Sequence, residues 1–241
     1  MIGSRKQALT PSQCASIITA AEQVNFRKAQ VRNTDGSSSY NEAHREGMVC
    51  FLRPDDLPAE TWEAVQHAIT SMNEQYYNAV IDTLDLQVAE YTGGQIGFEW
   101  HNDDPPYPSE NLIWSGRKLT CVFELSDPTT YSGGYLEIQP YRMMRQTSNI
   151  FGRSQEIVGR TLQNLNASRL SIQDNKIEII INDEVTRSIS GTSISPEELT
   201  NDSRERGEAT MFPSFFYHKV HPVVEGKRYS LTVWAKGPLW V

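Results

Sequence analysis

Two histidines and one aspartate have the residue types and spacing of ligands for a single metal ion. His101 and Asp103 stand two residues apart, so on an extended backbone both side chains leave the same face of the chain. His218, far along the sequence, can supply a third ligand. Two imidazoles and one carboxylate, with the other positions of the ion left open, form the facial triad that holds Fe(II) for dioxygen activation. The three residues therefore predict a site of this kind.

Each of these ligands has a competing interpretation. Loop-forming residues flank Asp103, so the pair with His101 is by itself also typical of a surface turn. His221 competes with His218 for the third place. If both histidines lie on one strand, His218 shares its face with Val220, whereas His221 points the other way beside a proline. We therefore favour His218.

The size and charge of the chain limit the classes of function. Its 241 residues, of which 38% are hydrophobic, can bury one sizeable core, and one decorated domain over residues 1–241 fits better than two equal domains. The chain has 30 acidic and 22 basic residues, and the resulting net charge of -8 argues against a broad surface for nucleic acid.

The cysteines and the start of the chain favour a reducing compartment. The chain has three cysteines, an odd number, and no two of them are closely spaced: Cys14, Cys50 and Cys121. Neither a disulfide framework nor a zinc knuckle is therefore indicated. The first residues lack the apolar core of a signal peptide, and no apolar run reaches the length of a membrane span. We expect a soluble, cytoplasmic protein without a membrane partner. Its oligomeric state stays open.

A helical support region is expected first, over residues 8–83. Thr10 can cap a helix, and Gln13 can complete a capping box with it. After the polar stretch 33–41, which is expected to be a loop, Pro58 opens a second helix. The apolar residues of this helix recur at spacings of three and four, which is typical of a core-facing side: Trp62, Val65, Ile69, Met72 and Tyr76.

Strands are expected from Leu84 onward, where the apolar period changes to two. Three further runs have strand character: 118–125, 135–138 and 210–234. Residues 141–206 are polar and irregular apart from an expected hairpin of 176–181 with 184–189, so we interpret them as an insertion. It could be a lid over a pocket, an oligomer contact or a decoration. The whole pattern predicts an α+β fold, mainly β with supporting helices.

Several motifs occur in a characteristic order along the chain. Glu-Trp-His-Asn-Asp at 99–103 is followed by Leu-Ser-Asp-Pro at 125–128 and Tyr-Ser-Gly-Gly-Tyr-Leu at 131–136. His-x-Val-x-Pro-Val at 218–223 and Gly-x-Arg-Tyr-Ser-Leu at 226–231 complete the set. Together they resemble the Fe(II)- and 2-oxoglutarate-dependent dioxygenases, specifically the prolyl 4-hydroxylase-like branch that includes the PKHD-type hydroxylases.

The resemblance covers roughly residues 8–140 and 207–238, which is all of the chain except the insertion and the termini. It implies a double-stranded β-helix, also called a jelly roll, with N-terminal helices packed on one side. The core strands of this jelly roll are expected within 84–140 and 207–238.

The resemblance also implies roles for individual residues. The expected Fe(II) ligands are His101, Asp103 and His218. Arg228 is expected to clamp the far carboxylate of 2-oxoglutarate with its planar guanidinium fork, and Tyr91 to line the pocket of this co-substrate. By strand alternation Thr232 faces the same way as Arg228 and can donate a hydroxyl to the same carboxylate. Ascorbate is expected as a supporting reductant.

One residue departs from the pattern of the family. Glu124 lies where several prolyl hydroxylases place a tyrosine that hydrogen-bonds 2-oxoglutarate. A second carboxylate at this place repels the first unless it is protonated or paired. We expect Glu124 either to turn toward the mouth of the pocket or to pair with a cation.

The implied activity is hydroxylation of an unactivated C–H bond with dioxygen, with release of succinate and CO2. The expected substrate is a prolyl residue of a peptide or protein, and the alternative is a free amino acid or another small metabolite. Oxidative demethylation of nucleic acid fits the acidic charge less well, and the chain has no stripe of aromatic and basic residues for stacking bases. A jelly-roll binding module without turnover is the alternative from another class.

Overall fold

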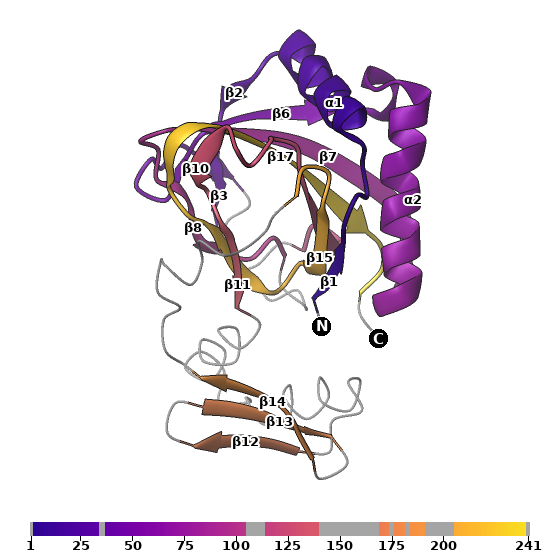
Figure 1. Cartoon of the computed structure of the whole chain (residues 1–241), viewed down its shortest axis with the longest axis vertical. Coiled ribbons are helices and arrows are strands. Elements are labelled where there is room, and N and C mark those ends of the chain that lie inside the picture. The colour runs from indigo at the N-terminus through magenta and orange to yellow at the C-terminus, as the bar shows by residue number, and fades with distance from the viewer. Residues whose placement is uncertain are drawn as a thin grey trace. The chain divides into compact units, whose positions relative to one another are not determined.

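A large antiparallel sheet is built around β17 (Val223–Lys236), which pairs on one side with β7 (Thr83–Thr92) and on the other with β9 (Arg117–Glu124). The structure, a computed structural model, describes residues 2–33, 37–104, 114–139, 169–173, 176–181, 184–190 and 205–239. The sheet runs in the order β1-β15-β9-β17-β7-β6-β2, and β10 is joined to β17 (Figure 1). Its other strands are β1 (Gly3–Arg5), β15 (Ala209–Pro213), β6 (Met48–Leu52), β2 (Arg27–Lys28) and β10 (Tyr131–Gly133).

A smaller antiparallel sheet completes the barrel-like core. It runs in the order β11-β16-β8-β5. Its strands are β11 (Leu136–Gln139), β16 (Tyr217–Val220), β8 (Gly97–His101) and β5 (Arg45–Glu46). Side chains from both sheets line one cavity, so the cavity lies between them. Figure 1 shows the two antiparallel sheets with helices on one side. Together with the cavity between the sheets, this arrangement agrees with the predicted double-stranded β-helix and with the predicted α+β class.

The helices cover the face of the large sheet that points away from the cavity. They are α1 (Pro11–Val24), α2 (Ala59–Tyr76) and the short 3-10 helix η1 (Pro54–Asp56). Leu231 and Val233 of β17 belong to one buried cluster with Ile17 of α1 and Ile69 of α2. This cluster is the main core, and its burial orients the opposite face of β17 toward the cavity.

The predicted helix starts are confirmed. Thr10 caps α1 by accepting a hydrogen bond from the backbone N–H of Gln13, and both halves of the capping box are present. Helix α2 follows Pro58, as predicted. The strands expected from Leu84 and at 118–125 correspond to β7 and β9. The expected run 135–138 corresponds to β11, and the expected run 210–234 corresponds to β15, β16 and β17.

The structure differs from the expectation for residues 8–83, because this region also contributes strands. Strand β6 is a run of five residues, too short for a helix, and it pairs with β7 where that strand would otherwise leave an unpaired edge. The stretch 33–41, predicted as a loop, contains β4 (Ser38–Ser39), which pairs with β3 (Val31–Arg32). Residues 34–36 of that stretch lie outside the described residues.

Residues Pro140–Asp202 form a second compact unit. It contains a three-stranded antiparallel sheet of β12 (Arg169–Gln173), β13 (Lys176–Ile181) and β14 (Glu184–Ser190). The predicted hairpin is confirmed by the pairing of β13 with β14, while the two residues between these strands lie outside the described residues. A lid function for this insertion stays a prediction.

The three cysteines are all free thiols in buried positions, as expected for a chain without a disulfide framework. Within the described ranges, no helix combines the length and apolar character that crossing a membrane requires.

The packing of β17 predicts a large difference between two nearby aliphatic residues. Replacing the fully buried Leu231 by alanine leaves a cavity in the main core, and we expect Leu231→Ala to lower the free energy of unfolding by about 2–5 kcal/mol. Val224 on the same strand is 66% exposed, and we expect Val224→Ala to change it by less than about 0.5 kcal/mol. Urea denaturation followed by tryptophan fluorescence measures both values. Equal effects would contradict the assignment of the core face.

Candidate functional site

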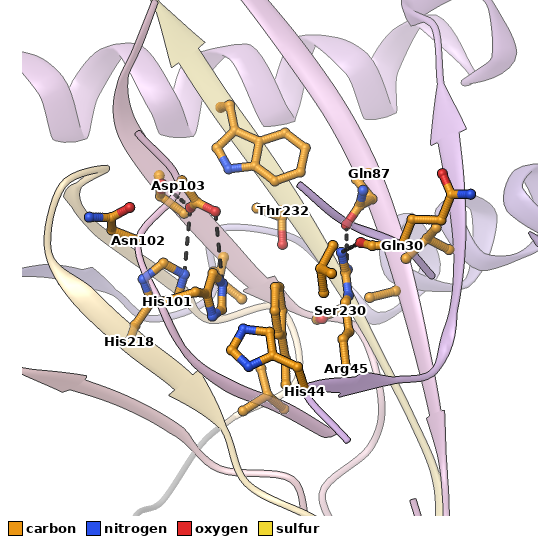
Figure 2. Close-up of a pocket in the computed structure, with 18 of the residues that line it drawn as sticks. Gln30, His44, Arg45, Gln87, His101, Asn102, Asp103, His218, Ser230 and Thr232 are labelled. Atoms are coloured by element: carbon orange, nitrogen blue, oxygen red, sulfur yellow. Dashed lines mark hydrogen bonds and ion pairs between the residues drawn. The ribbon is translucent and has the colours of Figure 1, made fainter. Parts of the chain in front are cut away.

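The predicted metal ligands come together at the ends of two paired strands. His101 is the last residue of β8, and its partner across the β8–β16 ladder is His218. Asp103 follows two residues after His101, and the ligand atoms of all three residues lie within 4.8 Å of one another. An Asp103 carboxylate oxygen lies 3.9 Å from His101 Nε2, and the other lies 3.5 Å from His218 Nε2 (Figure 2). The predicted His-Asp-His group is therefore present as a spatial cluster.

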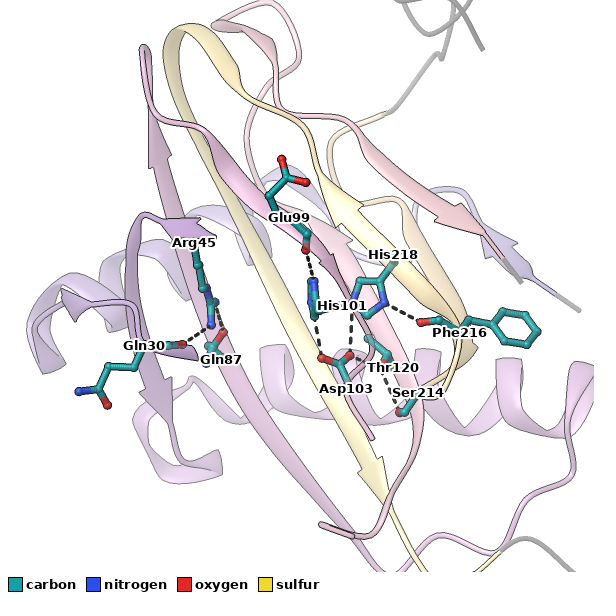
Figure 3. Close-up of polar contacts among 10 residues, drawn as sticks. All are labelled: Gln30, Arg45, Gln87, Glu99, His101, Asp103, Thr120, Ser214, Phe216 and His218. Carbon is teal, nitrogen blue, oxygen red and sulfur yellow. Dashed lines mark hydrogen bonds and ion pairs between the residues drawn. The ribbon is translucent and has the colours of Figure 1, made fainter. Parts of the chain in front are cut away.

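Backbone carbonyls orient both imidazoles (Figure 3). His101 Nδ1 lies 2.7 Å from the carbonyl oxygen of Glu99, and His218 Nδ1 lies 3.0 Å from that of Phe216. A carbonyl oxygen can only accept, so in each ring Nδ1 carries the proton and donates it. Each Nε2 then presents a lone pair toward the cluster, which is the usual arrangement of a metal-ligating histidine.

The Asp103 carboxylate is held in the same way. The hydroxyl of Thr120, on β9, donates to Asp103 Oδ2 at 2.6 Å, and the Ser214 hydroxyl lies 3.0 Å from that of Thr120. The backbone N–H of Asp103 also donates to the Ser214 carbonyl oxygen. These contacts link the loop after β8 to β9 and to the segment before β16 (Figure 3).

The electrostatics of the cluster suit a cation. Burial and the neighbouring His218 hold the pKa of His101 well below the ordinary value of 6.5, so its imidazole is neutral at neutral pH. Burial alone would raise the pKa of Asp103, but its interactions with His218, His101 and Arg117 outweigh burial and lower the pKa to about 2. A neutral imidazole and an ionised carboxylate are the protonation states that metal binding requires.

A cavity of about 490 Å³ contains this cluster together with the residues predicted to bind the co-substrate. This volume is in the range typical of small-molecule sites, about 300–1,000 Å³. Arg228, Tyr91 and Thr232 all line it, and Arg228 lies opposite Tyr91 in the pairing of β17 with β7. The predicted alternation of β17 is confirmed. The residues of its cavity face are Arg228, Ser230, Thr232 and Trp234.

Glu124 pairs with a cation, which was one of its two expected arrangements, and the cation is Arg228 itself. The Nε and Nη2 groups of Arg228 donate to Glu124 Oε2 at 3.1 and 2.8 Å. Arg228 is only 1% exposed. Burial alone would lower the pKa of Arg228, but the adjacent Glu124 carboxylate outweighs burial and raises it. The guanidinium therefore stays charged inside the protein.

The residues of the cavity fit both Fe(II) and 2-oxoglutarate, the two groups that the sequence motifs imply. Two imidazoles and a carboxylate are a suitable donor set for Fe(II). Arg228 keeps capacity for a carboxylate, because Glu124 uses only its Nε–Nη2 edge while Nη1 donates to the Ser230 hydroxyl at 3.4 Å. A guanidinium has more N–H donors than one carboxylate oxygen can use. The hydroxyls of Ser230 and Thr232 lie on the same face of the strand.

His221, the competing third ligand, has a different role in the structure. Its Nε2 lies 2.8 Å from the Glu137 carboxylate on the neighbouring strand β11, and it does not belong to the His-Asp-His cluster. The choice of His218 from strand alternation is consistent with this arrangement.

Sequence reasoning missed three residues beside the cluster. Thr120 supports Asp103, the Phe98 ring stacks on the His101 ring with centroids 3.4 Å apart, and the Arg45 guanidinium lies 4.3 Å from the Phe98 centroid. Thr120 could have been found from the alternation of β9, because it lies four residues before Glu124 and so on the same face. Arg45 carries no such signal, since β5 has only two residues.

Comparison with known proteins identifies the family. Residues 86–236 match the family model of the 2OG-Fe(II) oxygenase superfamily. No curated protein sequence matches this chain.

Solved structures share the fold at low sequence identity. A prolyl-4-hydroxylase from Pseudomonas putida is 14% identical with a TM-score of 0.56, over 98% of this chain and 92% of that one. A prolyl hydroxylase from Trichoplax adhaerens, in complex with a hypoxia inducible factor peptide fragment, is 15% identical with a TM-score of 0.58, over 98% and 83%. A non-heme alpha-ketoglutarate-dependent carbocyclase from nogalamycin biosynthesis is 10% identical with a TM-score of 0.55, over 96% and 78%.

The matched region spans more than half of the chain. It includes His101, Asp103, His218 and Arg228. The fold of the structural relatives agrees with the jelly roll described above. The chain therefore belongs to the 2OG-Fe(II) oxygenase superfamily.

Proposed function

We propose that the protein is an Fe(II)- and 2-oxoglutarate-dependent dioxygenase that hydroxylates an unactivated C–H bond. In the overall reaction, substrate, dioxygen and 2-oxoglutarate give hydroxylated substrate, succinate and CO2. One observation carries this proposal: a single cavity contains the cluster of His101, Asp103 and His218 and also a buried arginine, Arg228. A metal site beside a carboxylate-binding group is what a keto-acid co-substrate requires.

The proposed roles follow from the contacts of each residue. His101, Asp103 and His218 hold Fe(II), with their orientation fixed by carbonyl and hydroxyl partners. Arg228 binds the far carboxylate of 2-oxoglutarate, and Tyr91 and Thr232 line the same space. When bound, Fe(II) and 2-oxoglutarate together supply the activation of dioxygen. The protein contributes the orientation of both groups.

A prolyl ring is the first substrate to test. Two of the structural relatives are prolyl hydroxylases, and one of them is in complex with a peptide. The carbocyclase has the same fold, so the fold alone does not decide between a peptide and a small molecule. We therefore propose hydroxylation of a prolyl residue as the first candidate and of a free amino acid or other small metabolite as the second.

The direct test is an incubation with Fe(II), ascorbate, dioxygen and 2-oxoglutarate, with and without pools of peptides or metabolites. We expect succinate to form, and we expect the true substrate to increase its formation and to gain the mass of one oxygen. A folded, Fe(II)-loaded sample that never forms succinate with any pool would contradict the enzyme and favour a binding module without turnover.

His218 and His221, three positions apart in the sequence, give a matched test of the metal site. We expect His218→Ala to weaken Fe(II) binding by more than about 100-fold, because it removes a ligand, and even the loss of an outer partner costs about 10–100-fold. His221→Ala removes a histidine that pairs with Glu137, and we expect it to leave Fe(II) affinity within about 3-fold of the wild type. Anaerobic titration with Fe(II) measures both. The reverse order of effects would assign the third ligand to His221.

The pairing of Glu124 with Arg228 predicts tighter co-substrate binding when the Glu124 charge is removed. Glu124→Gln keeps an oxygen acceptor for Arg228 but removes a carboxylate that repels the co-substrate carboxylate, so we expect the Kd of 2-oxoglutarate to fall about 10-fold. Arg228→Gln should raise it by more than about 100-fold.

Calorimetry with Fe(II) and without dioxygen measures these constants. Glu90→Gln is the matched control, because Glu90 pairs with Lys227 at 3.3 Å, whereas Glu124 pairs with Arg228 of the cavity. We expect no change for this variant. An unchanged or larger Kd for Glu124→Gln would show that Glu124 acts only by positioning Arg228.

A further inference from the structure

Four arginines among the described residues line the cavity, namely Arg27, Arg45, Arg117 and Arg228, and Arg45 is the one that contacts both Gln30 and Gln87. Figures 2 and 3 both show Arg45 grouped with Gln30 and Gln87, apart from His101 and Asp103. Arg45 belongs to the two-residue strand β5, which pairs with β8. The site roles proposed above leave this arginine without a function.

The contacts of Arg45 leave its positive charge uncompensated. Its Nη2 donates to the Gln87 side-chain oxygen at 2.9 Å, and its Nη1 donates to the Gln30 carbonyl oxygen at 3.3 Å. Both acceptors are neutral. Within the described ranges no carboxylate forms an ion pair with Arg45, in contrast to Arg228, which pairs with Glu124. The cavity therefore favours an anion near Arg45.

Hydrogen-bond donors also lack acceptors in this cavity. Arg45 Nε is buried and has no acceptor among the described residues, and the same holds for Nε1 of Trp234, which lines the cavity from β17. A buried donor without an acceptor is unfavourable, and a charged donor more so. A ligand that supplies acceptor oxygens would satisfy these donors. An unpaired Nε–H on a guanidinium whose charge is uncompensated favours an anionic oxygen ligand over a neutral one.

Arg45 is close to the metal cluster. Its guanidinium carbon lies 4.3 Å from the centroid of the Phe98 ring, and the opposite stacking partner of that ring, His101, has its centroid 3.4 Å away. One aromatic ring thus separates the cation from a metal ligand. A small molecule anchored by its anionic group on Arg45 can therefore present a nearby carbon to the metal site.

We infer that Arg45 binds a carboxylate of the primary substrate, and that this substrate is a small acid such as a free amino acid. The inference rests on the proposed oxygenase function and deepens it, because the contacts of Arg45 favour the second substrate class named there, a free amino acid, over a prolyl residue of a peptide. A single carboxylate matches one uncompensated guanidinium in charge and in planar geometry. The acidic side chain of a peptide offers the same chemistry from another source.

The experiment compares acids with their neutral amides. The full chain, with Fe(II) and 2-oxoglutarate and without dioxygen, is titrated by calorimetry with the common free amino acids and with their carboxamides. We expect at least one acid to bind about 10-fold or more tightly than its carboxamide. Peptides with blocked ends, carrying either aspartate or asparagine, form the third arm.

Variants of Arg45 test whether the selectivity depends on this residue. We expect Arg45→Gln to reduce the preference for the acid by about 10-fold or more, and Arg45→Lys to retain part of it because the charge remains. Arg53→Gln is the matched control, since Arg53 pairs with Asp56 and its side chain is 82% exposed. It should not change the preference. A thermal unfolding curve for each variant verifies that the chain is folded.

The outcomes separate the two levels of the proposal. Equal binding of acids and carboxamides, no binding of any free acid, or an unchanged preference in Arg45→Gln would overturn the inference while succinate formation still supported the oxygenase. Selection of the aspartate peptide without selection of any free acid would overturn the small-acid source. Absence of succinate with every pool would instead contradict the proposed function, whatever the binding shows.

Discussion

Strand β17 has to satisfy two environments at once, and the site depends on how it does so. One face carries Leu231 and Val233 into the apolar core under the helices, and the other carries Arg228 and Thr232 into the cavity. Because strand side chains alternate strictly, a shift of the pairing by one residue would bury the arginine in the core and expose the leucine to the cavity. The apolar core therefore fixes the register that positions the co-substrate arginine.

The buried pair of Glu124 and Arg228 is the second consequence of this register. A lone guanidinium in an apolar interior is strongly unfavourable, so a carboxylate on the neighbouring strand stabilises it. The same carboxylate lowers the net charge at the end of the cavity where a dicarboxylate is proposed to bind. Arg45 differs, since its described partners are neutral groups. Arg45 and Arg228, two of the arginines that line the cavity, thus have different electrostatic environments.

The sequence could predict the features that depend on local patterns. The capping box at Thr10, the alternation through β17 and the two-residue spacing of His101 and Asp103 are all local, and each agrees with the structure. The sequence could not predict that Phe98 stacks on His101 or that Arg45 stacks on Phe98. Strand β5 has too few residues to show a period, and its pairing with β8 is a long-range contact without a local signature. The sequence showed that the Glu124 carboxylate would repel 2-oxoglutarate unless it was paired. It could not show that the partner is Arg228, because this contact depends on the pairing of β9 with β17.

The position of the insertion also affects how the centre assembles. The chain leaves the jelly roll after β11 and re-enters it before β15, so β8 can meet β16 only after the whole intervening unit has been synthesised. Loop-closure entropy grows only logarithmically, by about 0.6 kcal/mol for each doubling of the loop, so the fold tolerates such a long excursion at small thermodynamic cost. The insertion is instead expected to lower the folding rate, because pairing between distant segments such as β8 and β16 slows folding. A nascent chain that stalls within the insertion would contain His101 and Asp103 but not His218, so its proposed iron site would be incomplete.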